Sequence, residues 1–226
     1  MADIEKHKRV NDILLGPLER PALQWLSARM PAGVTPDILT ALGVLGGLVI
    51  SLGYILSNID RNYIWLASFG FVVNWFGDSL DGTLARYRHI ERPKFGFFID
   101  HTTDTFSQAV IFLGLGLSPY VSFNVASMTL IGYLMLGVLA YVRTSVVGEF
   151  KISYGKLGPT EIRVIAILLN TTMFFIGIKP VEWSLAKVQL AFSVYDIPVS
   201  IIALLLFGFF FNSAWKQAHS LSRLGE

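Results

Sequence analysis

Long apolar stretches, separated by short polar ones, occupy most of this chain. Six of them tolerate only occasional polar residues: 37–58, 62–80, 95–117, 121–147, 160–178 and 197–214. As a helix, each stretch is long enough to cross a hydrocarbon layer about 30 Å thick. The pattern therefore predicts an all-α integral membrane protein with six transmembrane helices.

The segment before the first apolar stretch has a different pattern. Residues 10–26 mix leucines and Trp25 with charged side chains, which is typical of an amphipathic helix at a membrane interface. We expect residues 1–36 to form an N-terminal cytoplasmic or interfacial segment, and residues 37–226 to form one six-helix membrane domain. Thr35 and Pro36 predict the start of the first membrane helix, since threonine caps helices and proline is tolerated in the first turn.

Composition and charge agree with this topology and orient it. The chain of 226 residues is 53% hydrophobic and only 15% charged, with a mean hydropathy of +0.56. With six spans, fifteen Lys and Arg fall on the side of both termini and three, Arg61, Lys179 and Lys187, fall opposite. Because positive residues favour the cytoplasmic side, we expect both termini in the cytoplasm. No nucleic-acid partner is expected.

Four aspartates lie where two apolar stretches approach that side. Asp78 and Asp81 are expected to end the second membrane helix, and Asp100 and Asp104 lie on the third. Spacings of three and four place each pair on one helix face. Four carboxylates in a medium less polar than water repel each other and need a counter-charge. Oxygen ligands favour Mg²⁺ or Mn²⁺, as one or two ions, and the chain has no cysteine to favour a softer metal.

The residues around these aspartates form a longer pattern. Asp78-x-x-Asp81-Gly82-x-x-Ala85-Arg86 is followed by nine residues and then by Gly96-x-x-x-Asp100-x-x-x-Asp104. This pattern resembles the signature of the CDP-alcohol phosphotransferase family at every fixed position. The resemblance implies a membrane enzyme of phospholipid synthesis. Such an enzyme moves a phospho-alcohol unit from a CDP-alcohol to an acceptor hydroxyl and releases CMP.

The resemblance also implies roles for individual residues. Asp78, Asp81 and Asp100 would be the main metal ligands, and Asp104, beside the same ions, would be the base that takes the acceptor proton. The CDP group would be bound by six residues of the signature: Asp78, Asp81, Gly82, Ala85, Arg86 and Gly96. Family members are usually homodimers, so a homodimer is expected here.

A second polar group precedes and opens the fifth apolar stretch, on the same side as the aspartates. Arg143, Lys151, Glu161 and Arg163 are candidates for binding the acceptor. Cations at that place would suit a phosphorylated acceptor. With such an acceptor the donor would be CDP-diacylglycerol.

Three alternatives stay open on the sequence. The donor could be a small CDP-alcohol, as in a CDP-choline or CDP-ethanolamine transferase acting on diacylglycerol. Intramembrane carboxylates also serve cation transporters, although transport does not require the frame of Gly82, Ala85, Arg86 and Gly96. A family member that has lost catalysis is disfavoured because all four aspartates are intact.

Overall fold

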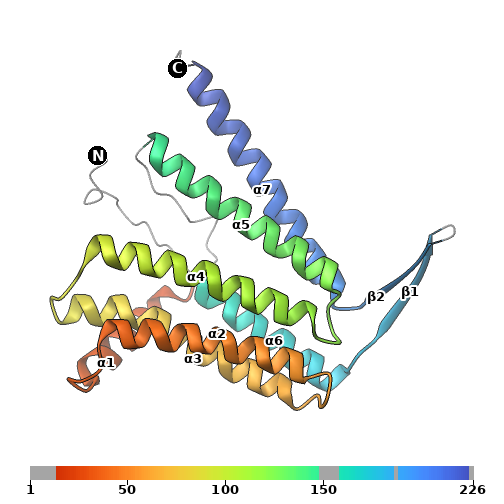
Figure 1. The fold of residues 1–226 in the computed structure, drawn as a ribbon, viewed down its shortest axis with the longest axis horizontal. Helices are drawn as coiled ribbons and strands as arrows, with labels where there is room; N and C mark the ends of the chain where they lie inside the picture. The colour runs from red at the N-terminus through yellow and green to blue at the C-terminus, as the bar shows by residue number, and fades with distance from the viewer. Residues whose placement is uncertain (1–13, 148–157, 186–187, 224–226) are drawn as a thin grey trace.

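The computed structural model describes residues 14–147, 158–185 and 188–223. Seven helices and one β-hairpin make up these ranges (Figure 1). In chain order they are α1 (Gly16–Arg29), α2 (Pro36–Leu56), α3 (Tyr63–Tyr87), α4 (Pro93–Gly116), α5 (Phe123–Val147), α6 (Pro159–Ile176), β1 (Pro180–Leu185), β2 (Val188–Ser193) and α7 (Asp196–Arg223). The mainly helical architecture expected from the sequence is confirmed.

Four helices in the described ranges are long and apolar enough to cross a membrane: α2, α5, α6 and α7. Helices α3 and α4 have comparable lengths, but they carry the aspartates and other polar residues that lower their hydropathy. The structure thus has a helix at each of the six expected stretches, and four of these qualify as spans by composition. Long apolar helices of this kind indicate an integral membrane protein.

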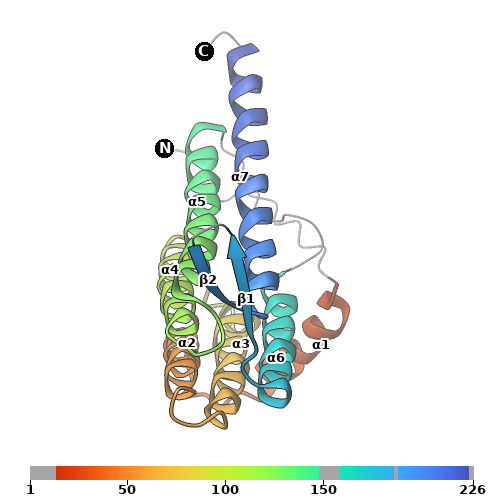
Figure 2. The same ribbon diagram turned by 90° about the vertical axis from the view of Figure 1, so that its right-hand side faces the viewer.

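Helices α2, α3 and α4 run side by side, with α6 against α3, while α5 and α7 pair and extend beyond them (Figures 1 and 2). The β1–β2 hairpin is antiparallel, with Pro180 opposite Ser193, and the hydrophobic pattern of the sequence does not predict it. Asp196, which begins α7, is 1% exposed and accepts hydrogen bonds from the backbone N–H groups of Ser122 and Ser193 at 2.7 and 2.8 Å. It thereby ties the start of α7 to the hairpin and to the segment before α5.

Small residues let α2 and α3 approach each other closely. A Cβ atom added at Gly77 would lie 2.7 Å from the Cα atom of Gly43, and one at Gly46 would lie 2.7 Å from the Cα atom of Asn74. Such contacts between small residues are a common way for membrane helices to pack. Because Gly77 directly precedes Asp78, this packing also places the first aspartate against α2.

Helix α3 does not end at the second aspartate. It continues through Gly82 to Tyr87, so the expected end at Asp81 is wrong. Leu80 and Leu84 are fully buried and pack in one cluster with Leu23 of α1 and Leu39 of α2. The apolar contacts on this face outweigh the helix cost of Gly82, which is about 1 kcal/mol.

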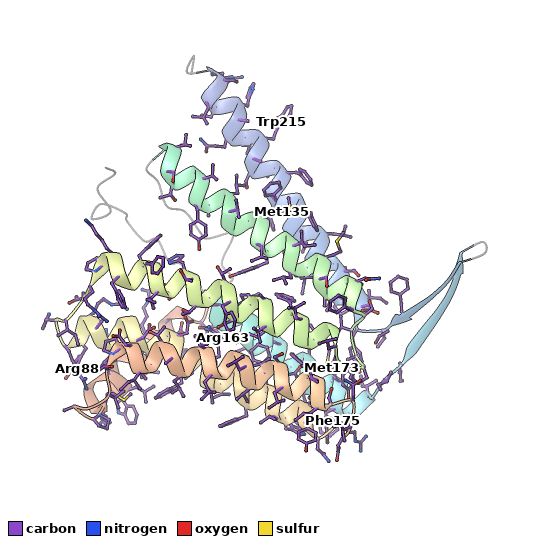
Figure 3. The ribbon with its side chains drawn as sticks, in the orientation of Figure 1. Arg88, Met135, Arg163, Met173, Phe175 and Trp215 are labelled. Carbon is purple, nitrogen blue, oxygen red and sulfur yellow. The ribbon has the colours of Figure 1, made fainter. Side chains whose placement is uncertain are left out.

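The expected start of the first membrane helix is confirmed. Thr35 caps α2 by accepting a hydrogen bond from the backbone N–H of Ile38, and Pro36 is the first helical residue. Arg88, labelled in Figure 3, holds the preceding segment in place. Its guanidinium donates to the carbonyls of Met30, Pro31 and Val34 at 3.0, 2.9 and 2.6 Å. These contacts fasten the connection between α1 and α2 to the end of α3.

The close α2–α3 contact makes Gly77→Ala a direct test of the fold. The added methyl group would meet backbone atoms of α2, and overpacking of this kind costs about 1–3 kcal/mol. We expect a lower midpoint in thermal unfolding of the detergent-solubilised protein. Gly137→Ala in α5 is the matched control, because a Cβ there meets nothing within 4 Å. Equal unfolding midpoints for the two variants would contradict the close packing.

Candidate functional site

The two aspartate pairs meet where the end of α3 lies beside the beginning of α4. Asp78 and Asp81 are one turn apart on α3, and Asp100 and Asp104 are one turn apart on α4. Asp78, Asp100 and Asp104 each offer one carboxylate oxygen, and these three oxygens lie within 4.8 Å of one another. All three side chains are half-buried. The convergence expected from the sequence therefore forms for three of the four aspartates.

Asp81 has different partners. Its Oδ2 atom accepts a hydrogen bond from the Thr40 hydroxyl at 2.6 Å, and its Oδ1 atom accepts one from the backbone N–H of Gly82 at 2.5 Å. Thr40 in turn lies in the second turn of α2. Asp81 thus joins α3 to α2 beside the group of three, and its expected role as a ligand stays a prediction.

A narrow cavity of about 10 Å³ lies beside this acidic group. Polar side chains supply most of its lining: Thr40, Asn74, Asp78, Thr103, Asp104 and Ser107. The sequence signature does not include Asn74 and Ser107, although helical spacing alone places both near the aspartates. Asn74 lies one turn before Asp78, and Ser107 lies three residues after Asp104, on the same helix faces.

Arg163 supplies positive charge to this acidic group. It lies in the first two turns of α6 and is 8% exposed, and its position is labelled in Figure 3. Its Nη2 atom donates to Oδ2 of Asp78 at 2.5 Å, and its Nε atom donates to Oδ1 of Asn74 at 2.8 Å. The sequence pattern predicted that Arg163 binds the acceptor, whereas in the structure its side chain is hydrogen-bonded to Asp78, a predicted metal ligand.

Four of the residues expected to bind CDP lie on the same two helices as the aspartates: Gly82, Ala85 and Arg86 on α3, and Gly96 on α4. Gly82 and Ala85 are half-buried on α3, and Arg86 is exposed, with Nη2 donating to the Thr83 hydroxyl at 3.2 Å. A Cβ atom at Gly96 would meet nothing within 4 Å. Gly96 therefore borders open space at the beginning of α4, as a substrate entrance requires.

Glu161 is buried and accepts hydrogen bonds from the protein backbone. Its Oε1 atom accepts from the backbone N–H of Leu15 at 2.6 Å, and its Oε2 atom accepts from that of Gly158 at 2.9 Å. The side chain, 4% exposed, thus caps α6 and docks the start of α1. Arg143 is half-buried near the end of α5, and Lys151 lies outside the described residues. Acceptor binding by these residues stays a prediction.

A larger cavity of about 380 Å³ lies between α4 and α5. Its lining is largely aromatic: Phe97, Phe98, His101, Thr102, Thr105 and Tyr141. The His101 ring stacks on Phe97, with ring centroids 4.1 Å apart, and its Nδ1 atom lies 2.8 Å from the Phe97 carbonyl oxygen. The Nδ1 atom of His101, in this lining, lies 3.8 Å from the Oδ2 atom of Asp100, so the cavity adjoins the acidic group.

The donor set fits a hard divalent cation. Three carboxylates supply oxygen ligands, which Mg²⁺ and Mn²⁺ prefer. Arg163 offsets part of their negative charge, and a divalent ion bound by the three carboxylates would offset more of it. Magnesium is usually held by one or two carboxylates together with substrate phosphates, so the site also has the composition to bind a diphosphate through the ion.

Comparison with known proteins identifies the family. A family model described as CDP-alcohol phosphatidyltransferase matches residues 33–211, which is most of the chain. This chain belongs to the CDP-alcohol phosphatidyltransferase family, and therefore to the transferases of phospholipid synthesis. The signature residues identified in the sequence lie inside the matched region.

Several curated relatives carry specific names. The archaetidylinositol phosphate synthase of Pyrococcus horikoshii is 36% identical over 61% of this chain and 69% of its own length. The phosphatidylinositol phosphate synthase of Cutibacterium acnes is 35% identical over 40% of this chain and 41% of its own length. The cholinephosphotransferase 1 of Gallus gallus is 26% identical over 81% of this chain and 56% of its own length. The matches thus span from about two fifths to about two thirds of these relatives.

The docking of α1 beside the site can be tested through Glu19. Its Oε1 atom accepts from Trp75 Nε1 of α3 at 2.8 Å and from the Thr160 hydroxyl of α6 at 2.5 Å. In Glu19→Ala both donors lose this acceptor, which costs about 1–3 kcal/mol for each buried group left unpaired. We expect faster hydrogen exchange in α1 than in the wild type. Glu91→Ala, at an exposed position between α3 and α4, should leave this exchange unchanged; equal exchange in both variants would contradict the docking role.

Proposed function

We propose that this protein transfers a phospho-alcohol group, with a divalent metal, from a CDP-alcohol to an acceptor hydroxyl and releases CMP. The observation that carries the proposal is the group of Asp78, Asp100 and Asp104, whose carboxylate oxygens lie within 4.8 Å of one another inside the family signature. A cation transporter could use the carboxylates alone. It would have no need of Gly82, Ala85, Arg86 and Gly96 around them.

In this reaction the acceptor oxygen attacks the phosphorus next to the donor alcohol, and the bond from that phosphorus to the CMP oxygen breaks. We assign Asp104 as the base that takes the acceptor proton. Asp78, Asp81, Asp100 and Asp104 would hold one or two Mg²⁺ or Mn²⁺ ions, which when bound neutralise the diphosphate and the departing CMP. Gly82 and Ala85 leave room for the nucleotide, and Arg86 would bind the diphosphate.

Two observations favour a lipid donor and a phosphorylated soluble acceptor. The largely aromatic cavity between α4 and α5 adjoins Asp100 and Asp104, so it could hold the apolar part of a CDP-lipid such as CDP-diacylglycerol. The names of the Pyrococcus and Cutibacterium relatives indicate products that carry inositol phosphate. We propose an inositol phosphate as the acceptor, with Arg143 and Lys151 as candidate phosphate ligands.

A second candidate reaction follows from the cholinephosphotransferase relative, which matches over more of this chain than the other two relatives do. In that reaction a small CDP-alcohol would be the donor and diacylglycerol the acceptor. The same aspartates would serve both reactions, because the signature concerns the CDP end of the donor. The two reactions differ in which substrate carries the lipid.

We place the site and both termini on the cytoplasmic side, on the basis of the fifteen Lys and Arg on that side and three opposite. The exposed Leu18 and Trp25 of α1 support its position at the membrane interface. A homodimer is proposed from the family resemblance.

The reaction can be tested by CMP release from purified protein. We expect Mn²⁺- or Mg²⁺-dependent CMP release with CDP-diacylglycerol and inositol phosphate, and less with serine, inositol or glycerol 3-phosphate. Asp104→Asn should lower turnover by about 10²–10⁴-fold, the usual contribution of a positioned base. Asp60→Asn, at an exposed position before α3, is the matched control and should keep wild-type turnover. CMP release only with CDP-choline and diacylglycerol would instead establish the second reaction.

The metal ligands can be tested without substrate. Titration of Mn²⁺ followed by the electron paramagnetic resonance of the free ion should show weaker binding in Asp78→Asn and Asp100→Asn. We expect losses above about tenfold, since even partners outside the ligand shell contribute about 10–100-fold. The same titration of Asp81→Asn tests whether the fourth aspartate is a ligand. Wild-type affinity in both Asp78→Asn and Asp100→Asn would refute the metal site.

A further inference from the structure

Arg163 is fixed to the wall of the site at two points. Its Nη2 atom binds Asp78 and its Nε atom binds Asn74, at 2.5 and 2.8 Å. Asn74 and Asp78 are one turn apart on the same face of α3, so the guanidinium spans one turn of that helix. The arginine itself comes from α6 and is 8% exposed.

We propose that Arg163 is a positioning residue for the metal site, and that Asn74 holds Arg163 in place. The arginine fixes the carboxylate of Asp78 in the orientation in which it meets Asp100 and Asp104. The main role of Arg163 is thus to act on the ion through Asp78. Binding of the acceptor is not its main role. This inference rests on the metal-dependent reaction proposed above, and it assigns the residue that organises the site of that reaction.

The hydrogen bond between Arg163 and Asn74 indicates that Arg163 positions Asp78 and does more than compensate its charge. A counter-charge requires only the contact between Nη2 and Asp78. Asn74 adds a second contact, and its own Nδ2 atom donates to the carbonyl of Gly43 on α2 at 2.9 Å. Asn74 therefore holds the guanidinium of Arg163 in place independently of Asp78. Its planar fork of donors suits such a two-point contact, which a lysine ammonium cannot reproduce.

The backbone that carries Arg163 is also fixed. Glu161, two residues earlier, accepts hydrogen bonds from the backbone N–H groups of Gly158 and of Leu15 at 2.9 and 2.6 Å. The first turn of α6 is thus held against the start of α1. A side chain that leaves this turn reaches α3 from a defined point, as a residue that orients a ligand must.

Charge and geometry predict opposite effects on metal affinity. Removal of a positive charge beside three carboxylates should strengthen cation binding if charge alone matters. Loss of a group that orients a ligand should weaken binding, by about 10–100-fold in characterised metal sites. The direction of the change in Mn²⁺ affinity therefore distinguishes a positioning residue from a counter-charge.

Acceptor binding makes a third, separable prediction. The Nη1 atom of Arg163 is buried and has no hydrogen-bond partner among the described residues, so it could reach a substrate oxygen. If that were its main role, substitution would raise the KM for the acceptor. It would leave the affinity for Mn²⁺ unchanged when no substrate is present.

The experiment compares Arg163→Gln, Arg163→Lys and Asn74→Ala in substrate-free Mn²⁺ titrations of the purified protein. We expect about 10–100-fold weaker binding in both arginine variants, because lysine keeps the charge but loses the fork. Asn74→Ala should weaken binding in the same direction and by less. Arg92→Gln is the matched control: it removes the same charge from an exposed ion pair with Asp37 and should bind Mn²⁺ like the wild type.

Equal or tighter Mn²⁺ binding in Arg163→Gln and Arg163→Lys would overturn the inference. Thermal unfolding without metal identifies any variant that does not fold. The test then uses those of Arg163→Gln, Arg163→Lys and Asn74→Ala that do fold. CMP release by the wild type is measured separately. Active wild-type protein with unchanged metal affinity in the Arg163 variants would refute the positioning role alone. Inactive wild-type protein with the expected loss of affinity would refute the reaction alone.

Discussion

Repulsion among carboxylates is the constraint on which this site depends. Asp78, Asp100 and Asp104 offer oxygens within 4.8 Å of one another, half-buried between helices. Like charges at such distances in a medium less polar than water strongly oppose folding unless they are compensated. Within residues 14–147, 158–185 and 188–223, Arg163 places a positive charge on Asp78, and the Thr40 hydroxyl donates a hydrogen bond to the neighbouring Asp81. The remaining negative charge is suited to a divalent ion.

Holding the carboxylates together requires rigid helices. The glycines of α2 and α3 allow backbone contact beside Asp78, and this close contact fixes where the α3 backbone carries that aspartate. Asn74 lies within the same contact and donates to the Gly43 carbonyl. The packing of small residues and the polar contacts of the site are thus parts of one structure.

The sequence predicted the parts of the site that depend on local spacing. Intervals of three and four residues placed the aspartates on two helix faces, and Thr35-Pro36 marked the start of α2. The bond between Arg163 and Asp78 joins positions 85 residues apart, and no periodicity reports such a contact. The β1–β2 hairpin does not follow from the sequence, because its residues lie between two apolar stretches that are long enough to be helices. The end of α3 was misplaced because the second apolar stretch stops at residue 80, beside the aspartates, whereas the buried side chains of Leu80 and Leu84 continue the helix.

Helix α6 contacts both α1 and the acidic group. Thr160 and Glu161 bind α1, and Arg163, on the next turn, binds α3 at the predicted metal ligand. Helix α1 carries exposed Leu18 and Trp25, which suit a membrane interface. The three polar residues of α6 therefore hold α1 on one side and the acidic group on the other. Through α6, the position of α1 is coupled to the position of the carboxylate of Asp78.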